Sequence, residues 1–425
     1  MTFEIITLGC KLNYCESAAI EKAFLADGFT APGDGEKADV YIINSCAVTG
    51  TAVTKARHEL SKCRRANPDC VAVLCGCFPQ SYPEEAGLKS NADIVVGNAD
   101  KSRLPELVRA YLQNRVKTVK ISSLSREYDL SSAVPDEDRT RAFIKIEDGC
   151  DRFCAYCIIP TARGRVRSLP LDLITEQAVQ CVENGHHEIV LTGINLGCYG
   201  QDMGLTLGDA VKAAARSGVE RVRLSSLEPE MITDEEIEKF RSVETLCPHF
   251  HLSLQSGSDT VLKRMNRKYT VSQYRETADK LRAAFPGCSI TTDIIVGFPG
   301  ETDEEFIETV DFAREIGFAK IHVFPYSIRK GTVAAEMPQL PPSVKTDRVQ
   351  MLTAAAKEIE QKFYESRIGT VHTVLIEKQQ SPEYSHGFTE SYIHVRIYGA
   401  NIPRHTLAKV QITGYRDSYC IGQLI

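Results

Sequence analysis

Several features common in chains of 425 residues are missing here. No run of about eighteen apolar residues occurs, so we expect no membrane-spanning helix. The N-terminal residues MTFEIITLGC have neither the basic segment nor the apolar core of a signal peptide, which predicts a cytoplasmic protein. Tryptophan and low-complexity segments are absent. The remaining composition, 43% hydrophobic and 25% charged residues, is typical of a globular protein.

Cysteine, in contrast, is abundant, with 15 residues and therefore an odd number. Thiols in the cytoplasm stay reduced, so disulfide bonds are not expected to explain them. We expect these residues to be metal ligands, catalytic groups or small core residues.

The length predicts two to three domains. Residues 1–125 alternate apolar runs with helical periodicity, which is typical of a parallel sheet covered by helices. Residues 126–141 lose this periodicity and form a predicted linker. The predicted strands are Glu4–Leu8, Val40–Asn44, Val71–Cys75 and Ile94–Val96, and the predicted helices are Glu16–Leu25, Thr51–Arg64 and Leu104–Leu112.

Residues 142–366 contain six strand–helix units. Six units are too few for a closed eight-stranded barrel, so an open or partial (β/α)6 barrel is predicted. Residues 367–425 contain alternating strands between Gly and Pro turns, which predict a small C-terminal β-barrel. The predicted fold class is therefore α/β with a C-terminal β-barrel.

The strongest chemical motif is Cys150-Asp-Arg-Phe-Cys154-Ala-Tyr-Cys157, which directly follows the first strand of the second series. Three thiolates within eight residues can bind one metal centre, and three ligands on a cubane iron–sulfur cluster leave one iron open. A structural zinc site and a chance grouping are the alternatives. Zinc sites are usually closed by four ligands, and no other His or Cys is near in the sequence.

This spacing and position resemble those of the radical S-adenosylmethionine (SAM) superfamily. The resemblance implies that the open iron binds SAM, which is then split to a 5′-deoxyadenosyl radical. Gly-rich segments at later strand ends support it, because glycine lets the backbone approach a ligand closely. The predicted SAM contacts are Thr192, Gly193, Asn195, Gln255, Ser256, Asp293, Gly297 and Pro299.

Three N-terminal cysteines, Cys10, Cys46 and Cys77, each follow a predicted strand by two residues. Because parallel strands end at the same edge of a sheet, we expect these thiols to converge on a second cluster with an open iron. Cys75 lies inside its strand and is the weaker candidate. The alternative is that all of them are small buried thiols.

The segments Leu8-Gly9-Cys10 with Asn13, Asn-Ser-Cys46 and Gly-Cys77 resemble the N-terminal domain of the methylthiotransferase family. A linker, a radical SAM domain and a C-terminal RNA-binding barrel called TRAM complete that family's order, so the resemblance covers essentially the whole chain. Residues 7–13 further resemble the branch that acts on threonylcarbamoyladenosine at position 37 of tRNA. The chain departs from the common branch pattern at Tyr14-Cys15.

The resemblance implies transfer of a methylthio group to carbon 2 of the adenine. It implies two [4Fe–4S] clusters as cofactors, held by Cys150/Cys154/Cys157 and by Cys10/Cys46/Cys77, with SAM as both methyl donor and radical source. The implied partners are a tRNA that carries threonylcarbamoyladenosine, an electron donor of the flavodoxin or ferredoxin type and an unidentified sulfur donor. A monomer is expected.

Two sets of basic residues are candidates for tRNA binding, because guanidinium groups pair with phosphates. One set follows the central cysteines, and for it salt bridges are an equal alternative. The other set lies in the C-terminal barrel among Tyr392, Tyr398 and Tyr415, and for each of its members a surface role is the alternative. The candidates are Arg163, Arg165 and Arg167 in the first set and Arg396, Arg404, Lys409 and Arg416 in the second.

Two other functions remain open. The same chemistry would suit isopentenyladenosine in tRNA or a ribosomal protein as substrate. An RNA-binding sensor of iron or oxygen would need the cysteines but would not need the Gly-rich strand ends. The nine remaining cysteines, among them Cys15, Cys63 and Cys198, show no grouping typical of ligands.

Overall fold

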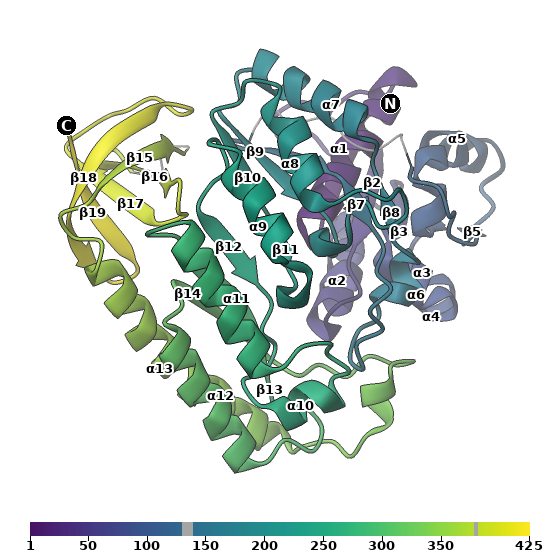
Figure 1. Cartoon of the computed structure of the whole chain (residues 1–425). Coiled ribbons are helices and arrows are strands. Elements are labelled where there is room, and N and C mark those ends of the chain that lie inside the picture. The colour runs from purple at the N-terminus through teal and green to yellow at the C-terminus, as the bar shows by residue number, and fades with distance from the viewer. Residues whose placement is uncertain (130–138, 378–380) are drawn as a thin grey trace. The chain divides into compact units, whose positions relative to one another are not determined.

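The computed structural model describes residues 1–129, 139–377 and 381–425 (Figure 1). Within these ranges, no helix is both long and apolar enough to cross a bilayer. The contacts of the chain form two compact units, and the domain boundaries inferred from the sequence stay a prediction. Unit 1 comprises Met1–Asp136, Glu147–Leu169 and Ser327–Ala335, and unit 2 comprises Glu137–Ile146, Pro170–Tyr326 and Glu336–Ile425.

Unit 1 is built on a parallel five-stranded sheet in which the strands follow chain order, β1-β2-β3-β4-β5. Its central strands are buried along their whole length, which explains why VYIINS and VAVLCG read as nearly continuous apolar runs. The strands are β1 (Phe3–Thr7), β2 (Val40–Ser45), β3 (Val71–Gly76), β4 (Ile94–Val96) and β5 (Thr118–Lys120).

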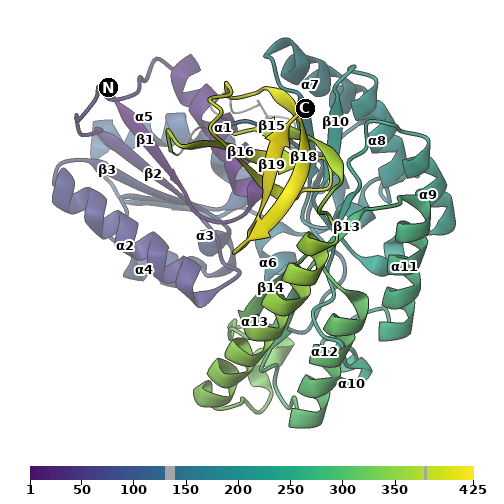
Figure 2. The same ribbon diagram turned by 90° about the vertical axis from the view of Figure 1, so that its left-hand side faces the viewer.

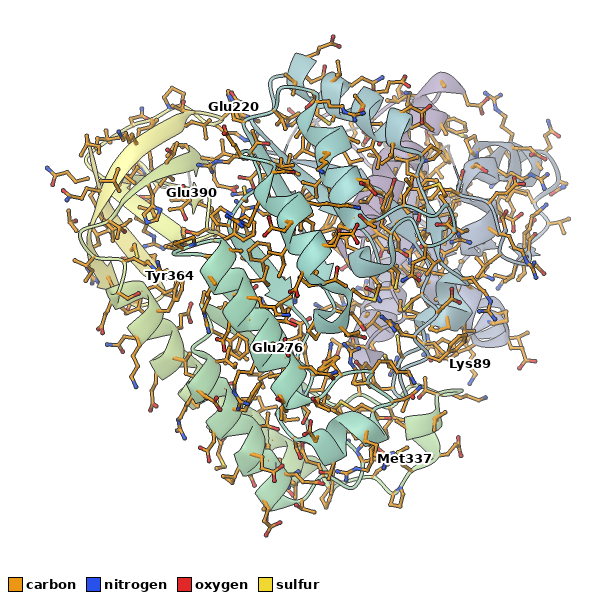
Figure 3. The ribbon with its side chains drawn as sticks, in the orientation of Figure 1. Lys89, Glu220, Glu276, Met337, Tyr364 and Glu390 are labelled. Atoms are coloured by element: carbon orange, nitrogen blue, oxygen red, sulfur yellow. The ribbon has the colours of Figure 1, made fainter. Side chains whose placement is uncertain are left out.

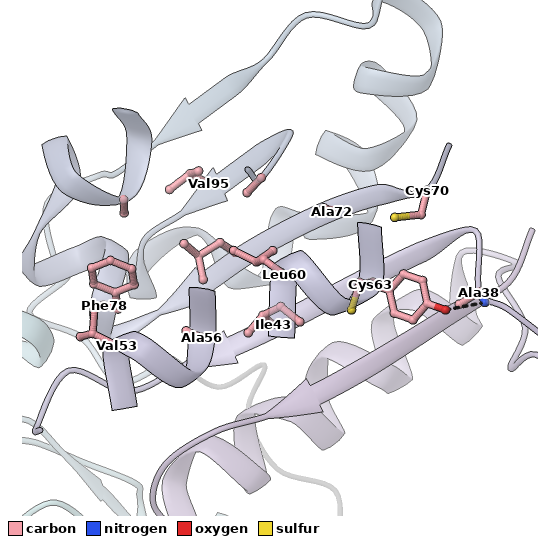
Figure 4. Close-up of a cluster of buried hydrophobic side chains, with 14 residues drawn as sticks. Ala38, Ile43, Val53, Ala56, Leu60, Cys63, Cys70, Ala72, Phe78 and Val95 are labelled. Carbon is pink, nitrogen blue, oxygen red and sulfur yellow. Dashed lines mark hydrogen bonds between the residues drawn. The ribbon is translucent and has the colours of Figure 1, made fainter. Parts of the chain in front are cut away.

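Two hydrophobic cores cover the two faces of this sheet. One lies under α2 and contains Leu60, Phe78 and Val95 (Figure 4). The other contains residues of α1 and α5, such as Phe24 and Val108. The helices of the unit are α1 (Lys11–Ala26), α2 (Gly50–Ala66), α3 (Cys77–Ser81), α4 (Pro83–Lys89), η1 (Asn98–Arg103), α5 (Leu104–Asn114) and α6 (Ile159–Arg163).

Unit 2 contains a partial barrel of parallel strands. Its strands form two ladders, β6-β9-β10 and β11-β12-β13-β14, and a bridge between Val222 and Leu246 links the two. β6 and β14 are edge strands, so the barrel is open, as the sequence predicts. The strands are β6 (Ala142–Lys145), β9 (Glu188–Thr192), β10 (Arg221–Leu224), β11 (Ser226–Leu227), β12 (His249–Leu252), β13 (Ser289–Val296) and β14 (Lys320–Pro325).

Helices cover the outside of these strands, and α12 and α13 lie side by side in both views (Figures 1 and 2). Threonine caps begin several of them: the Thr302 hydroxyl accepts from Glu305 N at the start of α12. The helices are α7 (Leu171–Glu183), η2 (Leu196–Cys198), α8 (Leu207–Ala215), η3 (Pro229–Met231), α9 (Asp234–Arg241), α10 (Asp259–Arg264), α11 (Val271–Ala284), α12 (Asp303–Ile316) and α13 (Pro342–Glu365). The short helix η4 (Val333–Glu336) belongs to unit 1 except for its last residue.

The C-terminal residues of unit 2 form a closed barrel in the order β15-β16-β17-β19-β18. Tyr364 near the end of α13 packs into its core, and Glu390 lies in the turn between β16 and β17 (Figure 3). The closed barrel confirms the predicted C-terminal fold. Its strands are β15 (Val371–Ile376), β16 (Tyr384–Thr389), β17 (His394–Tyr398), β18 (Leu407–Arg416) and β19 (Tyr419–Leu424).

A buried ion-pair network fills the amino-terminal end of the partial barrel. Glu188 accepts hydrogen bonds from the guanidinium groups of Arg141 (2.8 Å) and Arg223 (2.6 Å) and pairs with Arg221 at 3.4 Å. Burial by itself would raise the pKa of Glu188, but Arg223 and Arg141 lower it to about 2. Arg223 also lies over the ring of Tyr392, so the network joins the partial barrel to the C-terminal barrel.

Candidate metal-cluster and cofactor site

Cys10, Cys46 and Cys77 lie at the carboxyl ends of three neighbouring parallel strands. Cys10 follows β1 and is the N-cap of α1, Cys46 directly follows β2, and Cys77 directly follows β3. Since β1, β2 and β3 are adjacent, these ends meet at one edge of the sheet. The structure therefore confirms that the three thiols converge, while their role as ligands stays a prediction.

Glycine precedes two of these cysteines for a steric reason. Gly9 has a φ of 128°, and a Cβ there would lie 2.8 Å from the Cβ of Cys46. Gly76 has a φ of 103°, and its Cβ would lie 2.5 Å from the carbonyl oxygen of Ser45. Any side chain at either position would push the strand ends apart, so the glycines are what lets the cysteines approach one another.

Two buried asparagines hold these strand ends together. The Asn13 side-chain amide donates to Asn44 Oδ1 (3.3 Å), and the Asn44 amide donates to Asn13 O (2.9 Å) and to Ser17 Oγ (3.0 Å). Asn13 Oδ1 in turn accepts from the backbone N–H of Cys10 at 3.4 Å. The asparagine of the sequence motif thus positions the cysteine beside it.

Amide donors also reach the sulfur atoms. Asn98 Nδ2 lies 3.6 Å from Cys77 Sγ, and the backbone N–H of Val48 lies 3.5 Å from Cys46 Sγ. Asn98 Oδ1 is buried and has no hydrogen-bond partner in the described ranges. Donors aimed at sulfur favour the thiolate, which is the form that binds iron, so the surroundings fit a cluster.

The electrostatic setting of Cys46 disfavours a free thiolate. Burial, followed by the neighbouring Cys77, raises the pKa of Cys46 to about 12, and Arg163 acts in the opposite direction. At neutral pH such a thiol is protonated. Coordination of iron replaces the proton with positive charge and so makes ligation and deprotonation one event.

The second set of cysteines lies on a short loop closed at its base. The strands β7 (Glu147–Asp148) and β8 (Arg167–Ser168) pair antiparallel, and Cys150 N donates to Gly164 O at 3.0 Å. Between Cys154 and Cys157 the chain makes a turn, with Cys157 N donating to Cys154 O at 3.0 Å. Cys150 is buried and the other two are partly exposed, and the role of all three as ligands of one cluster stays a prediction.

Both sets of cysteines belong to unit 1. Cys77 packs with Ile158 and Ala162, which directly follow the second set on α6. Asn98, which contacts Cys77, donates to the carbonyl oxygen of Ala162 at 2.7 Å. The sequence predicts each set of cysteines separately, and only the tertiary contacts show that the two sets are neighbours.

Arg163 is buried between these sets, with a side chain only 1% exposed. Its guanidinium pairs with Glu16 at 2.7 Å and with Asp148 at 3.1 Å. Arg167 is buried as well and pairs with Asp148 at 3.3 Å. The prediction that Arg163 and Arg167 face tRNA phosphates is therefore corrected: both are held in salt bridges, the alternative left open above.

Arg165 differs from these neighbours. Its side chain is 75% exposed, it pairs with Asp151 at 2.9 Å, and it lies over the exposed ring of Phe153. Of the three arginines after the central cysteines, it is the one whose guanidinium can reach a phosphate in solution. Its contact with tRNA stays a prediction.

The predicted SAM contacts lie in unit 2 at or near the carboxyl ends of barrel strands. Thr192 ends β9, and Gly193 and Asn195 lie in the turn that follows. Gln255 and Ser256 follow β12, Asp293 lies within β13, and Gly297 and Pro299 follow β13. The structure bears out these positions, and contact with SAM stays a prediction.

Two observations at these strand ends fit a small polar ligand. Gln255 has a φ of 65°, although it is not glycine, and its backbone is fixed to β13 through Asp293 O (2.9 Å) and Ile295 N (2.9 Å). Ser225, directly after β10, has a buried hydroxyl with no hydrogen-bond partner in the described part of the chain. Sequence reasoning missed Ser225, whose only signal was its place after a strand.

The loop after β13 is fixed by a buried ion pair. Gly297 has a φ of 69° and donates its N–H to Glu301 Oε2 at 2.7 Å. Glu301 pairs with Arg348 of α13, which also pairs with Asp303 at 2.7 Å. This loop therefore holds its shape before any ligand binds.

In the C-terminal barrel the predicted RNA-binding side chains fall into two groups. Tyr398, Lys409 and Arg416 are exposed, and Arg396 lies over the rings of Tyr419 (3.9 Å) and Tyr384 (4.5 Å). The rest make contacts inside unit 2: Tyr392 stacks on Phe388 and His249, Arg404 donates to Thr140, and Tyr415 packs against Tyr364. Tyr392 nevertheless keeps 37% of its surface exposed, so its role in RNA binding stays a prediction.

Several of the remaining cysteines are core residues. Cys63 and Cys70 lie in the hydrophobic core under α2 (Figure 4), and Cys75 lies in the core on the other face of the sheet. Burial raises the pKa of Cys75 to about 12. Because Cys75 faces the core, Cys77 is the better partner for Cys10 and Cys46.

Comparisons with known proteins agree with this arrangement. Residues 144–313 match the family model described as the radical SAM superfamily, and residues 2–97 match one described as the uncharacterized protein family UPF0004. In structure, the chain is similar to the radical S-adenosylmethionine methyltransferase TsrM from Kitasatospora setae, with a TM-score of 0.59, 14% identity and coverage of 79% of this chain and 77% of that one. The fold and the cysteine loop thus define a radical SAM protein.

Comparison with curated relatives identifies the family within the radical SAM superfamily. The threonylcarbamoyladenosine tRNA methylthiotransferase MtaB is 39% identical in Bacillus subtilis, over 99% of this chain and 95% of that one, and 40% identical in Thermotoga maritima, over 94% and 92%. A tRNA-2-methylthio-N(6)-dimethylallyladenosine synthase of Pelotomaculum thermopropionicum is 32% identical over 99% and 97%. The chain belongs to the radical SAM methylthiotransferase family, whose cofactors are SAM and two [4Fe–4S] clusters.

Proposed function

We propose that this protein is a transferase that adds a methylthio group to carbon 2 of the adenine of threonylcarbamoyladenosine in tRNA. The observation that carries the proposal is the presence of two three-cysteine sets in one compact unit, next to one another through Cys77 and Ile158. Relatives named for this reaction match nearly the whole chain at 39–40% identity.

The reaction explains why two sets are needed. The C–H bond at carbon 2 of adenine is neither acidic nor electrophilic, so acid–base catalysis offers no route to replace the hydrogen. When bound, one cluster supplies the electron that activates SAM, and the other presents the sulfur. The ligands would be Cys150, Cys154 and Cys157 for the first cluster and Cys10, Cys46 and Cys77 for the second.

The chain's own residues supply position and charge. Asn13 and Asn44 hold the strand ends that carry the second set, and Asn98 spans from Cys77 to α6. Arg163 places a positive charge beside the thiolates and lowers the pKa of Cys46 against the effect of burial. The loop at Gly297 and the strand end at Gln255 offer rigid backbone for SAM.

The C-terminal barrel and Arg165 would bind the tRNA. Arg396 between Tyr384 and Tyr419, together with the exposed Lys409 and Arg416, offers cations and aromatic rings on one small barrel. Such a combination binds RNA phosphates and unstacked bases. The reaction would take place in the cytoplasm, with the protein as a monomer, a flavodoxin or ferredoxin as electron donor and a sulfur donor that is not yet known.

The decisive test is mass spectrometry of tRNA nucleosides from cells that lack the gene. Loss of 2-methylthio-threonylcarbamoyladenosine alone supports the proposal, whereas loss of the isopentenyl product would assign the second substrate. Cluster-loaded protein should also form the product in vitro, and Cys10→Ala and Cys150→Ala should each abolish it. The proposal fails if the Cys10→Ala protein still makes the methylthio product. Reduced protein that does not cleave SAM would instead support an iron–sulfur sensor.

A further inference from the structure

Three metal-binding side chains meet inside the partial barrel, on strands that carry none of the cysteines assigned above. His251 lies on β12, Asp293 on β13 and His322 on β14. In the register of the sheet, Asp293 pairs with His322 and His251 pairs with Thr291, two residues before Asp293. All three side chains therefore project from the same face of the sheet.

That face is the interior of the partial barrel. Phe250, which alternates with His251 along β12, contacts Phe240 of α9 and Phe285 next to α11, so it faces the covering helices. His251 must then face the opposite way. Its ring lies 6.0 Å from that of His322.

The distances fit a single cation. One ligand atom from each residue lies within 4.8 Å of the other two, and His251 Nε2 lies 3.4 Å from Asp293 Oδ2. For a tetrahedral ion with bonds of about 2.0–2.1 Å, neighbouring ligand atoms are about 3.3–3.4 Å apart. The His251–Asp293 pair already has this separation, and His322 offers a ligand atom within 4.8 Å of both.

The residues around His251 hold its ring in the orientation that a metal needs. Thr291 Oγ1 lies 3.0 Å from His251 Nδ1 and 3.1 Å from His249 Nε2. In the tautomer whose Nδ1–H donates to Thr291, the threonine hydroxyl donates to His249, and His251 Nε2 is free to bind a metal ion beside Asp293. Metal-binding histidines are commonly fixed by such a second hydrogen bond.

The site is open on one side. His322 is exposed and lines a groove of about 1010 Å³ along the edge of β14, between α13 and the turn at 415–418. Lys320 and Lys357 line the same groove. Three protein ligands with access from solvent leave coordination positions for a further ligand, as in metal sites that bind substrate.

We propose that His251, Asp293 and His322 bind one divalent transition-metal ion, and that its open positions bind the carboxylate of the threonylcarbamoyl group. The second part rests on the proposed function. Two imidazoles and one carboxylate suit ions such as Fe²⁺, Co²⁺ or Zn²⁺. Without an ion, Asp293 would repel an anionic substrate group; with a divalent ion the site carries one net positive charge and attracts it. Asp293 was also predicted to contact SAM, so the two assignments compete.

The test uses Co²⁺ and the full chain with both clusters loaded and oxidised, so that the cysteines are occupied. Equilibrium dialysis and electron paramagnetic resonance would measure binding to the wild type, His251→Ala and His322→Ala. The matched control is His187→Ala, which removes an exposed histidine that pairs with Glu220 at 2.9 Å. We expect one Co²⁺ per chain and affinity reduced by about 100-fold or more in both site variants, because even outer contacts of metal ligands change affinity by about 10–100-fold. The control should bind as the wild type does.

A second arm adds free nucleosides to the Co²⁺-loaded protein. Threonylcarbamoyladenosine should change the Co²⁺ spectrum, whereas isopentenyladenosine, which has no carboxylate, should not. Absence of Co²⁺ binding, or binding that both site variants retain, overturns the metal site. Binding without a response to threonylcarbamoyladenosine overturns the role in substrate recognition. If Co²⁺ binds but the protein makes no methylthio product from any tRNA, the proposed function fails and the metal site stands.

Discussion

The two units each contain a buried ion-pair network, and the networks differ in net charge. In unit 1, three cations contact two carboxylates, which gives these five side chains one net positive charge: Arg163, Arg167 and Lys101 with Glu16 and Asp148. In unit 2, three guanidinium groups contact three carboxylates, and the charges cancel: Arg141, Arg221 and Arg223 with Glu188, Glu377 and Glu390.

This difference in net charge indicates which network affects the neighbouring cysteines and which one only stabilises the fold. A buried network whose charges cancel does not shift the charge state of a neighbouring group. The network in unit 2 instead connects the strands of the partial barrel to the C-terminal barrel. An excess cation beside converging thiols favours their thiolate form. We therefore expect the network of unit 1 to serve a cluster at the neighbouring cysteines and the network of unit 2 to serve stability.

The largest expected effect is that of Arg163→Met, which should change both stability and cluster content. The substitution removes the charged hydrogen bonds that Arg163 donates to Glu16 and Asp148, which costs about 1.5–3 kcal/mol of unit 1 stability. It also removes the charge that favours the thiolates, so iron analysis should show loss of the second cluster. Denaturation curves and iron content measure both. Arg165→Met, on the exposed neighbour, should change neither; equal iron loss in both variants would contradict the comparison.

Glu188→Gln should affect only stability. Removal of the carboxylate leaves three buried guanidinium groups without their shared partner, at a cost of about 3–5 kcal/mol for unit 2. Cluster content per folded chain should stay at the wild-type level. Glu220→Gln, on an exposed side chain, is the control. Loss of iron in Glu188→Gln would show that the two networks do not have separate roles.

Acid should destabilise unit 2 through the same residue. Folding lowers the pKa of Glu188 from 4.5 to about 2, so its contribution is complete above pH 4.5 and is lost as the pH falls toward 2. A pKa difference of this size corresponds to about 3 kcal/mol. Thermal unfolding of cluster-free protein between these pH values should show the loss in the wild type. In Glu188→Gln this loss of stability toward pH 2 should be absent. If the variant keeps the pH dependence of the wild type, Glu188 is not its cause.

The smallest expected effect is on tRNA binding. Arg165→Ala should weaken binding a few-fold and lower the slope of log affinity against log salt by about 1, because one phosphate contact is lost. Lys89→Ala removes another exposed cation of unit 1 and should leave the slope unchanged. Filter binding over a range of salt concentrations measures both. Equal slopes for the wild type and Arg165→Ala would exclude the contact.

Periodicity located most of the regular elements. β4 begins and ends at the predicted residues, and β2 and β3 each extend one residue beyond the predicted end, because runs of apolar residues report burial directly. The strands missed were β5, β7, β8, β11, β16 and β19. β16 has the sequence YSHGFT, in which small and polar residues mask the pattern, and it becomes a strand only because its neighbours in the closed barrel pair with it.

The sequence likewise predicted some features of the candidate site and not others. Local patterns were enough to place Cys10, Cys46 and Cys77 at the ends of parallel strands. Contacts between distant residues were not visible in the sequence: Arg163 and Glu16 are 147 residues apart, and the burial that makes this pair a salt bridge exists only in the fold.

The sequence alone therefore determined the cysteine sets, the strand–helix order and the resemblance to a family, because each depends on spacing along the chain. The tertiary structure decided which charges are buried, that the two cysteine sets are neighbours, and that His251, Asp293 and His322 share one face. These depend on strand register and on contacts across the fold, which spacing does not encode.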